Sequence, residues 1–157
     1  MSEDESEINI NKILATYEGN NICSDCETND PDWGVNCVLL KTYVFVCIKC
    51  SGIHRDLGTH ISKVKSTKYD VYKPELLDFV IKQGGNKVVN DIIQGGKPFY
   101  IVNPKISDNE DVLKWFIRTK YQKQAFSINN YNNEMNKFNA IMKNNNNNNN
   151  DAETKDD

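Results

Sequence analysis

Two short stretches of sequence decide the fold of this chain: CSDC at residues 23–26 and CIKC at residues 47–50. Two residues between the cysteines of a pair allow both thiolates to turn toward one ion, and two such pairs form a closed tetrahedral set for Zn²⁺. One pair alone could be a redox motif, but two pairs separated by twenty residues are hard to explain without a metal. The alternatives are four unrelated buried thiols or two disulfides. We predict one structural zinc ion with four ligands: Cys23, Cys26, Cys47 and Cys50.

The start of the chain indicates a reducing compartment. Residues 1–7 read MSEDESE, the opposite of the basic start of a secretory signal peptide. The longest apolar run, residues 35–48, is interrupted by polar residues and is shorter than the roughly 18–20 residues of a membrane span. We therefore expect a cytoplasmic protein whose thiols bind metal rather than form disulfides. The fifth cysteine, Cys37, is expected to be a small buried residue on a strand.

The charge of the chain is distributed unevenly. Its 157 residues are enough for one domain with a modest core, and the net charge is −3. Residues 20–126 carry fifteen basic side chains against twelve acidic ones, whereas residues 1–19 and 127–157 are net acidic. A DNA-binding protein would usually be far more basic, so we expect no nucleic-acid partner.

The apolar pattern predicts a small α+β fold, in which a zinc-bound four-cysteine core with a short antiparallel sheet is surrounded by about five or six helices. Runs of β-branched and aromatic residues predict strands at residues 38–46 and 61–64. Helical spacing between proline, glycine and capping signals predicts helices at residues 8–18, 51–57, 74–83, 86–94 and 107–124. In the last helix, Ser107 and Glu110 have the spacing of a capping box.

The composition changes after Phe126, where asparagine becomes dominant and residues 144–150 are all asparagine. Such a segment has little apolar surface to offset the entropy cost of ordering, so we expect disorder. A weak terminal helix or a partner-docking segment stays open as an alternative, because apolar residues such as Met135 and Phe138 recur at near-helical spacing. The expected organisation has three parts: an acidic tail (1–7), the zinc-binding domain (8–126) and an Asn-rich tail (127–157).

One of only two arginines closely follows the fourth cysteine. Arg55 lies in the stretch SGIHRDLG at residues 51–58, which a metal at Cys50 would hold rigid. A fixed guanidinium is suited to stabilising charge on a phosphoryl group, because its planar fork is permanently charged. From the spacing alone, a surface salt bridge is the alternative. With four cysteines available, His54 and His60 are not expected to be metal ligands.

The longest motif is CIKCSGIHRDLGTHISKVKS at residues 47–66, a combination of a cysteine pair with GIHRxLG that no common zinc module has. It is accompanied by DPDW at residues 30–33, PELL at 74–77 and FIRTKY at 116–121. Together these motifs resemble the ArfGAP family, which are zinc-finger GTPase-activating proteins for Arf-type small GTPases. The resemblance spans roughly residues 8–126.

The resemblance implies that Arg55 is an arginine finger, inserted in trans into the nucleotide site of an Arf-family GTPase in its GTP-bound form. Trp33 and Asp70 would support the catalytic face, and Ile53 and Leu57 would pack the turn that carries the arginine. The zinc would be structural, since four thiolates leave no open position. The chain would be a GTPase activator with no independent reaction, acting as a monomer in vesicle traffic and transiently at membranes.

The chain departs from the family pattern at a few positions. The family usually has sixteen residues between the cysteine pairs and this chain has twenty, with the extra ones around residues 36–40. They would either lengthen a hairpin harmlessly or displace Trp33 from the catalytic face. Tyr72 and the pair Ile93-Gln94 stand where the family has tryptophan and Trp-Glu. A catalytically inactive ArfGAP-like adaptor is therefore a second hypothesis. A DNA-binding zinc finger is a third, which would need an arginine-rich recognition helix or tail.

Overall fold

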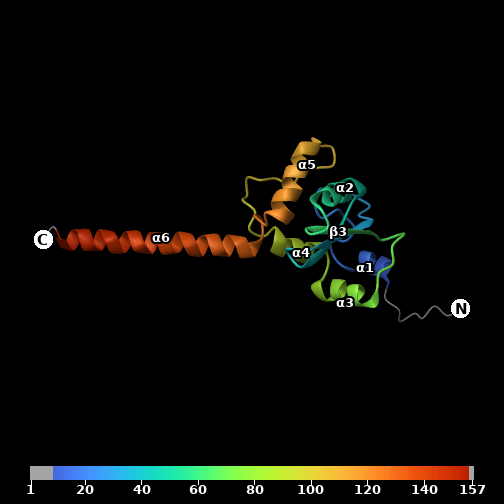
Figure 1. The fold of residues 1–157 in the computed structure, drawn as a ribbon, viewed down its shortest axis with the longest axis horizontal. Helices are drawn as coiled ribbons and strands as arrows, with labels where there is room; N and C mark the ends of the chain where they lie inside the picture. The colour runs from blue at the N-terminus through green and yellow to red at the C-terminus, as the bar shows by residue number, and fades with distance from the viewer. Residues whose placement is uncertain (1–8, 156–157) are drawn as a thin grey trace.

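The computed structural model describes residues 9–155, and a three-stranded antiparallel sheet lies at the centre of the domain (Figure 1). The middle strand is β1 (Trp33–Cys37), which pairs with β2 (Thr42–Val46) on one side and with β3 (Ser62–Ser66) on the other. The register places Trp33 opposite both Val46 and Ser66, so Trp33 lies where β2 ends and the second cysteine pair begins.

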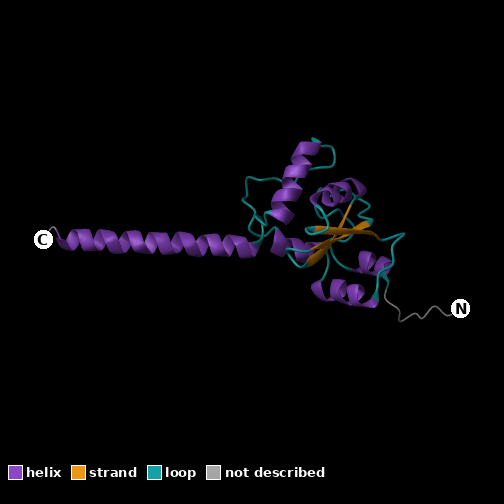
Figure 2. Ribbon diagram, viewed as in Figure 1, coloured by secondary structure: helices purple, strands orange, loops and turns teal. Residues whose placement is uncertain are grey.

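Six α-helices accompany the sheet within the described part of the chain (Figure 2). They are α1 (Ile10–Thr16), α2 (Ile48–Leu57), α3 (Pro74–Gln83), α4 (Asn86–Ile93), α5 (Glu110–Ile117) and α6 (Ile128–Lys155), with a π-helical turn η1 (Arg118–Gln122) directly after α5. Helices α1 and α3 cover one face of the sheet, and α2 covers the other. The predicted α+β class, with a short antiparallel sheet, helices around it and four clustered cysteines, is confirmed. None of the described helices combines the length and the apolar character that a membrane span needs.

Strand β2 is buried on both faces. Tyr43 and Phe45 pack into a cluster with α1 and α3, whereas Val44 and Val46 pack into a second cluster with α2, α4 and α5. Alternate side chains of a strand point to opposite faces, so a strand that is covered on both sides reads as a continuous apolar run. The strand that joins the two clusters leads directly into Cys47, and the sheet therefore positions the second cysteine pair.

The predicted strand at residues 38–46 is too long at its start. Strand β2 begins at Thr42, and residues 38–41 form the turn of the β1–β2 hairpin, in which Lys41 has a positive φ of 54°. Strand β1 was not predicted, because Gly34 and Asn36 lower its strand propensity. This turn overlaps the stretch at residues 36–40 where the extra residues are expected, and it lies at the end of β1 that is farthest from Trp33.

Helix α2 begins three residues before the predicted start. Cys47 is its N-cap, and the cysteine side chain accepts a hydrogen bond from the N–H of Cys50. The metal-binding pair thereby also starts the helix that carries Arg55. The helix ends before Gly58, as predicted, and Gly58 has a φ of 96°, a conformation that glycine adopts without strain.

The capping box predicted for α5 is wrong. The N-cap is Asn109, whose side chain accepts a hydrogen bond from the N–H of Asp111 at 2.8 Å. Asparagine is as good an N-cap as serine, so the helix starts two residues later than a cap at Ser107 requires. The helix also ends earlier, at Ile117, where the backbone changes to the π-helical geometry of η1.

The C-terminal segment differs from the expectation of disorder. Helix α6 projects away from the domain (Figure 1), so the structure has the terminal helix that was the open alternative. No proline or glycine interrupts residues 127–155, and the helix can satisfy its own backbone hydrogen bonds. Among the described side chains of α6, Met135 is 38% exposed and Phe138 is 54% exposed, so neither joins the core. The predicted acidic tail at residues 1–7 lies outside the described residues.

Candidate functional site

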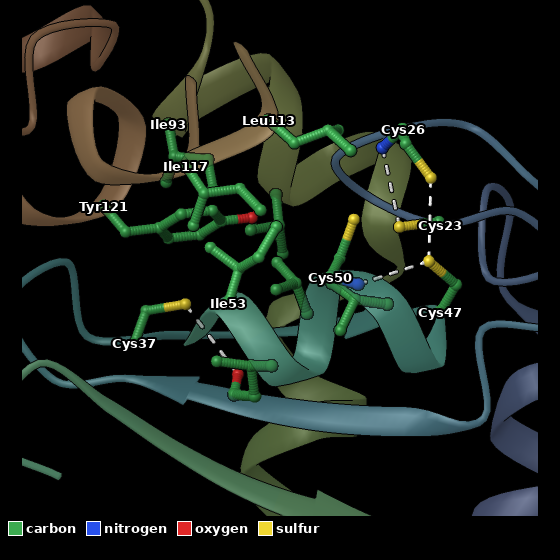
Figure 3. Close-up of a cluster of buried hydrophobic side chains, with 14 residues drawn as sticks. Cys23, Cys26, Cys37, Cys47, Cys50, Ile53, Ile93, Leu113, Ile117 and Tyr121 are labelled. Atoms are coloured by element: carbon green, nitrogen blue, oxygen red, sulfur yellow. Dashed lines mark hydrogen bonds between the residues drawn. The ribbon is translucent and has the colours of Figure 1, made fainter. Parts of the chain in front are cut away.

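Two separate turns bring four cysteines together (Figure 3). Cys23 and Cys26 lie in a tight turn, in which the N–H of Cys23 donates to the carbonyl of Thr28 at 2.8 Å. Cys47 caps α2, and Cys50 lies in its first turn. The four sulfur atoms lie within 4.8 Å of one another, and each cysteine is at most 3% exposed. The structure therefore assembles the predicted ligand set in one buried place.

The chemistry of this cluster suits a metal ion. A tetrahedral site with metal–sulfur bonds of about 2.3 Å has sulfur atoms about 3.8 Å apart, and the Sγ atoms of Cys26 and Cys47 are 3.6 Å apart. The N–H of Cys50 donates to Cys47 Sγ at 3.5 Å, and such bonds favour a thiolate. The four residues could hold one metal ion, and they would leave it no open position.

Cys37 is separate from this cluster, as Figure 3 shows. It lies at the end of β1, where its thiol donates to the carbonyl of Val35 at 3.8 Å. Burial raises the pKa of Cys37 to about 12, so the side chain stays a neutral thiol. This agrees with the interpretation of Cys37 as a small buried packing residue.

A buried ionic network lies against the cysteine turn. Asp25, between the first two cysteines, accepts from Lys120 Nζ at 2.9 Å and from the hydroxyl of Tyr121 at 2.5 Å. Its other carboxylate oxygen lies 2.8 Å from His54 Nε2, and His54 Nδ1 lies 3.0 Å from the hydroxyl of Ser62. The side chains of Asp25, His54 and Lys120 are fully buried. The network therefore joins the first cysteine pair to α2, β3 and η1.

The buried negative charge of Asp25 is compensated by its hydrogen-bonded partners in this network. Burial by itself would raise the pKa of Asp25. The charge of Lys120 and the hydrogen bond with His54 lower this pKa by more than burial raises it, so the pKa of Asp25 is below its ordinary value. From the sequence, His54 was weighed only as a metal ligand, Lys120 only as part of the motif at residues 116–121, and Asp25 was not singled out. The available signal was a lysine next to the apolar side chain of Tyr121, because a lysine in a buried segment needs a carboxylate partner.

Arg55 lies on the exposed side of α2, one residue after the buried His54. Its guanidinium carbon lies 5.2 Å from the centroid of the Trp33 ring, which is a cation–π contact. The predicted finger and the predicted supporting tryptophan are therefore neighbours in space. Behind them, Ile53 is 4% exposed in the core cluster, and Leu57 packs against that cluster.

An open groove of about 440 Å³ lies beside Trp33. Its wall includes six side chains from four separate segments: Asp32, Trp33, Ile48, Lys68, Tyr69 and Ile106. Ile48 is 71% exposed and Tyr69 is 86% exposed, which is unusual for side chains of this size. The groove and the exposed apolar side chains at its edge have the character of a surface that a partner could cover.

Asp70 lies at the surface and supports Trp33 through the backbone. Its carboxylate accepts from the N–H of Ser66 at 2.7 Å, and Ser66 is the residue of β3 opposite Trp33. Tyr69, next to Asp70, belongs to the same turn and lines the groove. Asp70 thus fixes the strand end and the turn beside the groove.

The fold and the site together define a class of protein: a small α+β domain built on a four-cysteine cluster, with an arginine displayed beside a groove. The chain belongs to the ArfGap family, because the family model described as "Putative GTPase activating protein for Arf" matches residues 8–130.

Relatives support this assignment. The chain is 41% identical over 113 residues to the Arabidopsis thaliana protein named "Probable ADP-ribosylation factor GTPase-activating protein AGD13", in an alignment that covers 72% of this chain and 32% of that protein. It is 34% identical over 113 residues to the Mus musculus protein "Stromal membrane-associated protein 1", covering 72% of this chain and 24% of that protein. The chain therefore spans a third or less of the length of these relatives.

Solved structures agree with the fold. The ArfGap domain of human RIP superposes with a TM-score of 0.65 at 25% identity, covering 82% of this chain and 91% of that domain. The ArfGap domain of HIV-1 Rev binding protein gives a TM-score of 0.59 at 28% identity, covering 74% of this chain and 86% of that chain.

Proposed function

We propose that this chain activates GTP hydrolysis by an Arf-type small GTPase in its GTP-bound form and catalyses no independent reaction. The observation that carries the proposal is the exposed guanidinium of Arg55, which lies over Trp33 beside an open groove. An activator needs a cation that is fixed in position and still within reach of a partner, and Arg55 meets both requirements. Family membership and the names of the relatives support an Arf protein as the substrate.

Arg55 would act on the partner's nucleotide. During transfer of the γ-phosphoryl group to water, negative charge spreads over the phosphoryl oxygens, and a guanidinium placed in trans donates hydrogen bonds to them. The side chain stays charged throughout, so it transfers no proton and only stabilises the developing charge. Arginine fingers of this kind accelerate hydrolysis by about 10³–10⁵.

Other residues of the site would position Arg55. The Trp33 ring contacts the guanidinium and would limit its orientations, and Asp70 would fix the strand end beside Trp33. Ile53 and Leu57 anchor α2 in the core, so the backbone beneath the arginine does not have to reorganise when the partner docks.

The proposed metal is one zinc ion held by Cys23, Cys26, Cys47 and Cys50. Four sulfur donors in a closed tetrahedral arrangement are typical of structural zinc sites. The ion would fix the first cysteine turn to the start of α2 and so hold the segment that carries Arg55. It would contribute stability and no chemistry to hydrolysis.

The proposed setting follows from the partner. We propose a cytoplasmic monomer that associates transiently with membranes through its GTPase or other factors and acts in vesicle traffic. Several basic side chains are available to border the GTPase and an anionic membrane surface: Lys49, Arg55, Lys63, Lys65, Lys68 and Lys73.

The test is single-turnover GTP hydrolysis by a lipid-bound Arf protein, with the zinc-loaded chain as wild type and as Arg55→Lys. Arg118→Lys is a matched control, because Arg118 is the other arginine of the chain and is also exposed. We expect acceleration by wild type and by the control, and a loss of about 10³ or more with Arg55→Lys. If none of the three folded proteins accelerates hydrolysis, the chain is an adaptor or acts on another GTPase.

A further inference from the structure

The connection between α4 and α5 carries two aromatic residues at the tip of a tight turn. The N–H of Ile101 donates to the carbonyl of Pro98 at 3.0 Å, which closes a β-turn with Phe99 and Tyr100 at its two central positions. We call residues 98–101 the aromatic turn. In Figure 1 this connection lies at the edge of the domain, on the side from which α6 projects.

The exposure of these residues is exceptional for the chain. Phe99 is 96% exposed, Tyr100 is 72% exposed, and Val102 just beyond the turn is 79% exposed. Central turn positions usually hold glycine, asparagine, aspartate or proline, so two aromatic residues there follow no rule of turn formation. Because water contact disfavours such side chains and the fold gains no core packing from them, their placement calls for something that covers them.

The turn is compact and is closed by hydrogen bonds at its two ends. Besides the Ile101 N–H bond, the carbonyl of Ile101 accepts a hydrogen bond from Lys97 Nζ. The rings of Phe99 and Tyr100 pack edge to face, with centroids 5.7 Å apart. A compact convex knob of this kind presents its two rings first, and aromatic rings are suited to the interfacial layer of a bilayer.

Lysines flank the aromatic turn on both sides, and the one acidic residue of the connection, Asp108, accepts a hydrogen bond from the N–H of Lys105 at 2.7 Å. Residues 97–107 contain Lys97 and Lys105 and no acidic residue. Lysines on both sides of an exposed aromatic tip complement anionic lipid headgroups, while phenylalanine and tyrosine are suited to the layer between headgroups and acyl chains. A protein partner would need a rigid pocket for this convex knob, whereas lipids rearrange around it.

We propose that the aromatic turn is a membrane-contact site. Phe99 and Tyr100 enter the interfacial layer of an anionic bilayer, Val102 extends the apolar contact, and Lys97 and Lys105 lie near the lipid phosphates. At its far end, the same connection reaches the groove beside Trp33, which Ile106 lines. Membrane contact at the turn would therefore limit the orientations in which that groove meets a membrane-bound partner.

This inference deepens the membrane association in the proposed function, but its test contains no GTPase, so the two can fail separately. The zinc-loaded full chain is sedimented with vesicles of phosphatidylcholine alone and with vesicles of equal parts phosphatidylcholine and phosphatidylserine. We expect preferential binding to the anionic vesicles, and at least about fivefold weaker binding for the double variant Phe99→Ser/Tyr100→Ser. Absence of wild-type binding to either kind of vesicle would overturn the proposal.

Two further variants separate membrane contact from general loss of apolar surface. Val88→Ser/Ile92→Ser is the matched control on α4, where these side chains are 48% and 46% exposed, and its vesicle binding should equal that of wild type. Phe99→Trp should retain binding, because tryptophan is also favoured at the membrane interface. If Phe99→Ser/Tyr100→Ser binds vesicles like wild type, the aromatic turn does not contact the membrane and the proposal is wrong.

Discussion

The guanidinium of Arg55 and the ring of Trp33 are in contact across two elements that the four cysteines and the sheet hold together, with 5.2 Å between the guanidinium carbon and the ring centroid. Trp33 begins β1, and the four-residue turn of the β1–β2 hairpin lies at the other end of that strand. The extra residues between the cysteine pairs therefore do not separate Trp33 from Arg55.

The first prediction concerns this contact. An exposed cation–π pair contributes about 0.5–1 kcal/mol, so Trp33→Ala should lower the rate of stimulated GTP hydrolysis about two- to fivefold. Trp33→Phe keeps an aromatic face and should lose less. Single-turnover hydrolysis measures both, with circular dichroism to show that the variants are folded. An unchanged rate for Trp33→Ala would mean that the contact does not persist in the complex with the GTPase.

The second prediction concerns metal removal. Structural zinc sites contribute about 10–16 kcal/mol to folding. The total free energy of unfolding of a domain is about 5–15 kcal/mol, which is of the same size. Excess chelator should therefore unfold the domain, and added zinc should restore it. Near-ultraviolet circular dichroism follows this change, since Tyr43, Phe45 and Tyr121 are packed in the core.

Two serine variants provide the comparison for the metal. Cys50→Ser removes a ligand and should abolish the folded state or make it insensitive to zinc. Cys37→Ser changes a buried cysteine outside the cluster, so its fold should still depend on zinc. A chelated wild-type protein with its full near-ultraviolet spectrum would contradict the four-cysteine zinc assignment.

Much of the fold follows from local signals in the sequence. The helix at Pro74 and the end of α2 at Gly58 carry strong start and stop residues, and the structure has both. Strand β1 was missed because WGVNC is a poor strand by composition and forms only through pairing with β2 and β3 on its two sides. Pairing of this kind is a tertiary effect that no short window of sequence contains.

The candidate site was predictable in part for the same reason. The cysteine cluster follows from spacing, because two C-x-x-C pairs commonly form one tetrahedral zinc site. The network around Asp25 does not follow from spacing: Asp25 and Lys120 are 95 residues apart in sequence and meet only in the fold. A sequence shows that a lysine lies in an apolar segment, but it does not show which carboxylate approaches it.

The third prediction concerns the C-terminal helix. The side chains of residues 135–146 in α6, among them Phe138 and Ile141, are exposed rather than packed in the core. Removal of residues 135–157 should therefore change the melting temperature of the zinc-loaded domain by less than about 2 °C, which corresponds to less than about 1 kcal/mol. Differential scanning calorimetry provides the measurement. A larger decrease would mean that α6 covers part of the domain in solution.

The last prediction concerns the buried ion pair. Lys120→Met leaves the carboxylate of Asp25 in the core without its cation, and breaking a buried pair on one side costs about 3–5 kcal/mol. Lys114→Met is the matched control, because Lys114 pairs with Glu110 at 3.8 Å on the surface, where such pairs contribute about 0–1 kcal/mol. Urea unfolding of the zinc-loaded proteins gives both values.

The double variant Asp25→Asn/Lys120→Met should lose less free energy of unfolding than the sum of its single variants, since the double variant leaves neither the carboxylate nor the ammonium group buried without its partner. If Lys120→Met costs no more than Lys114→Met, the negative charge of Asp25 is compensated by His54 rather than by Lys120.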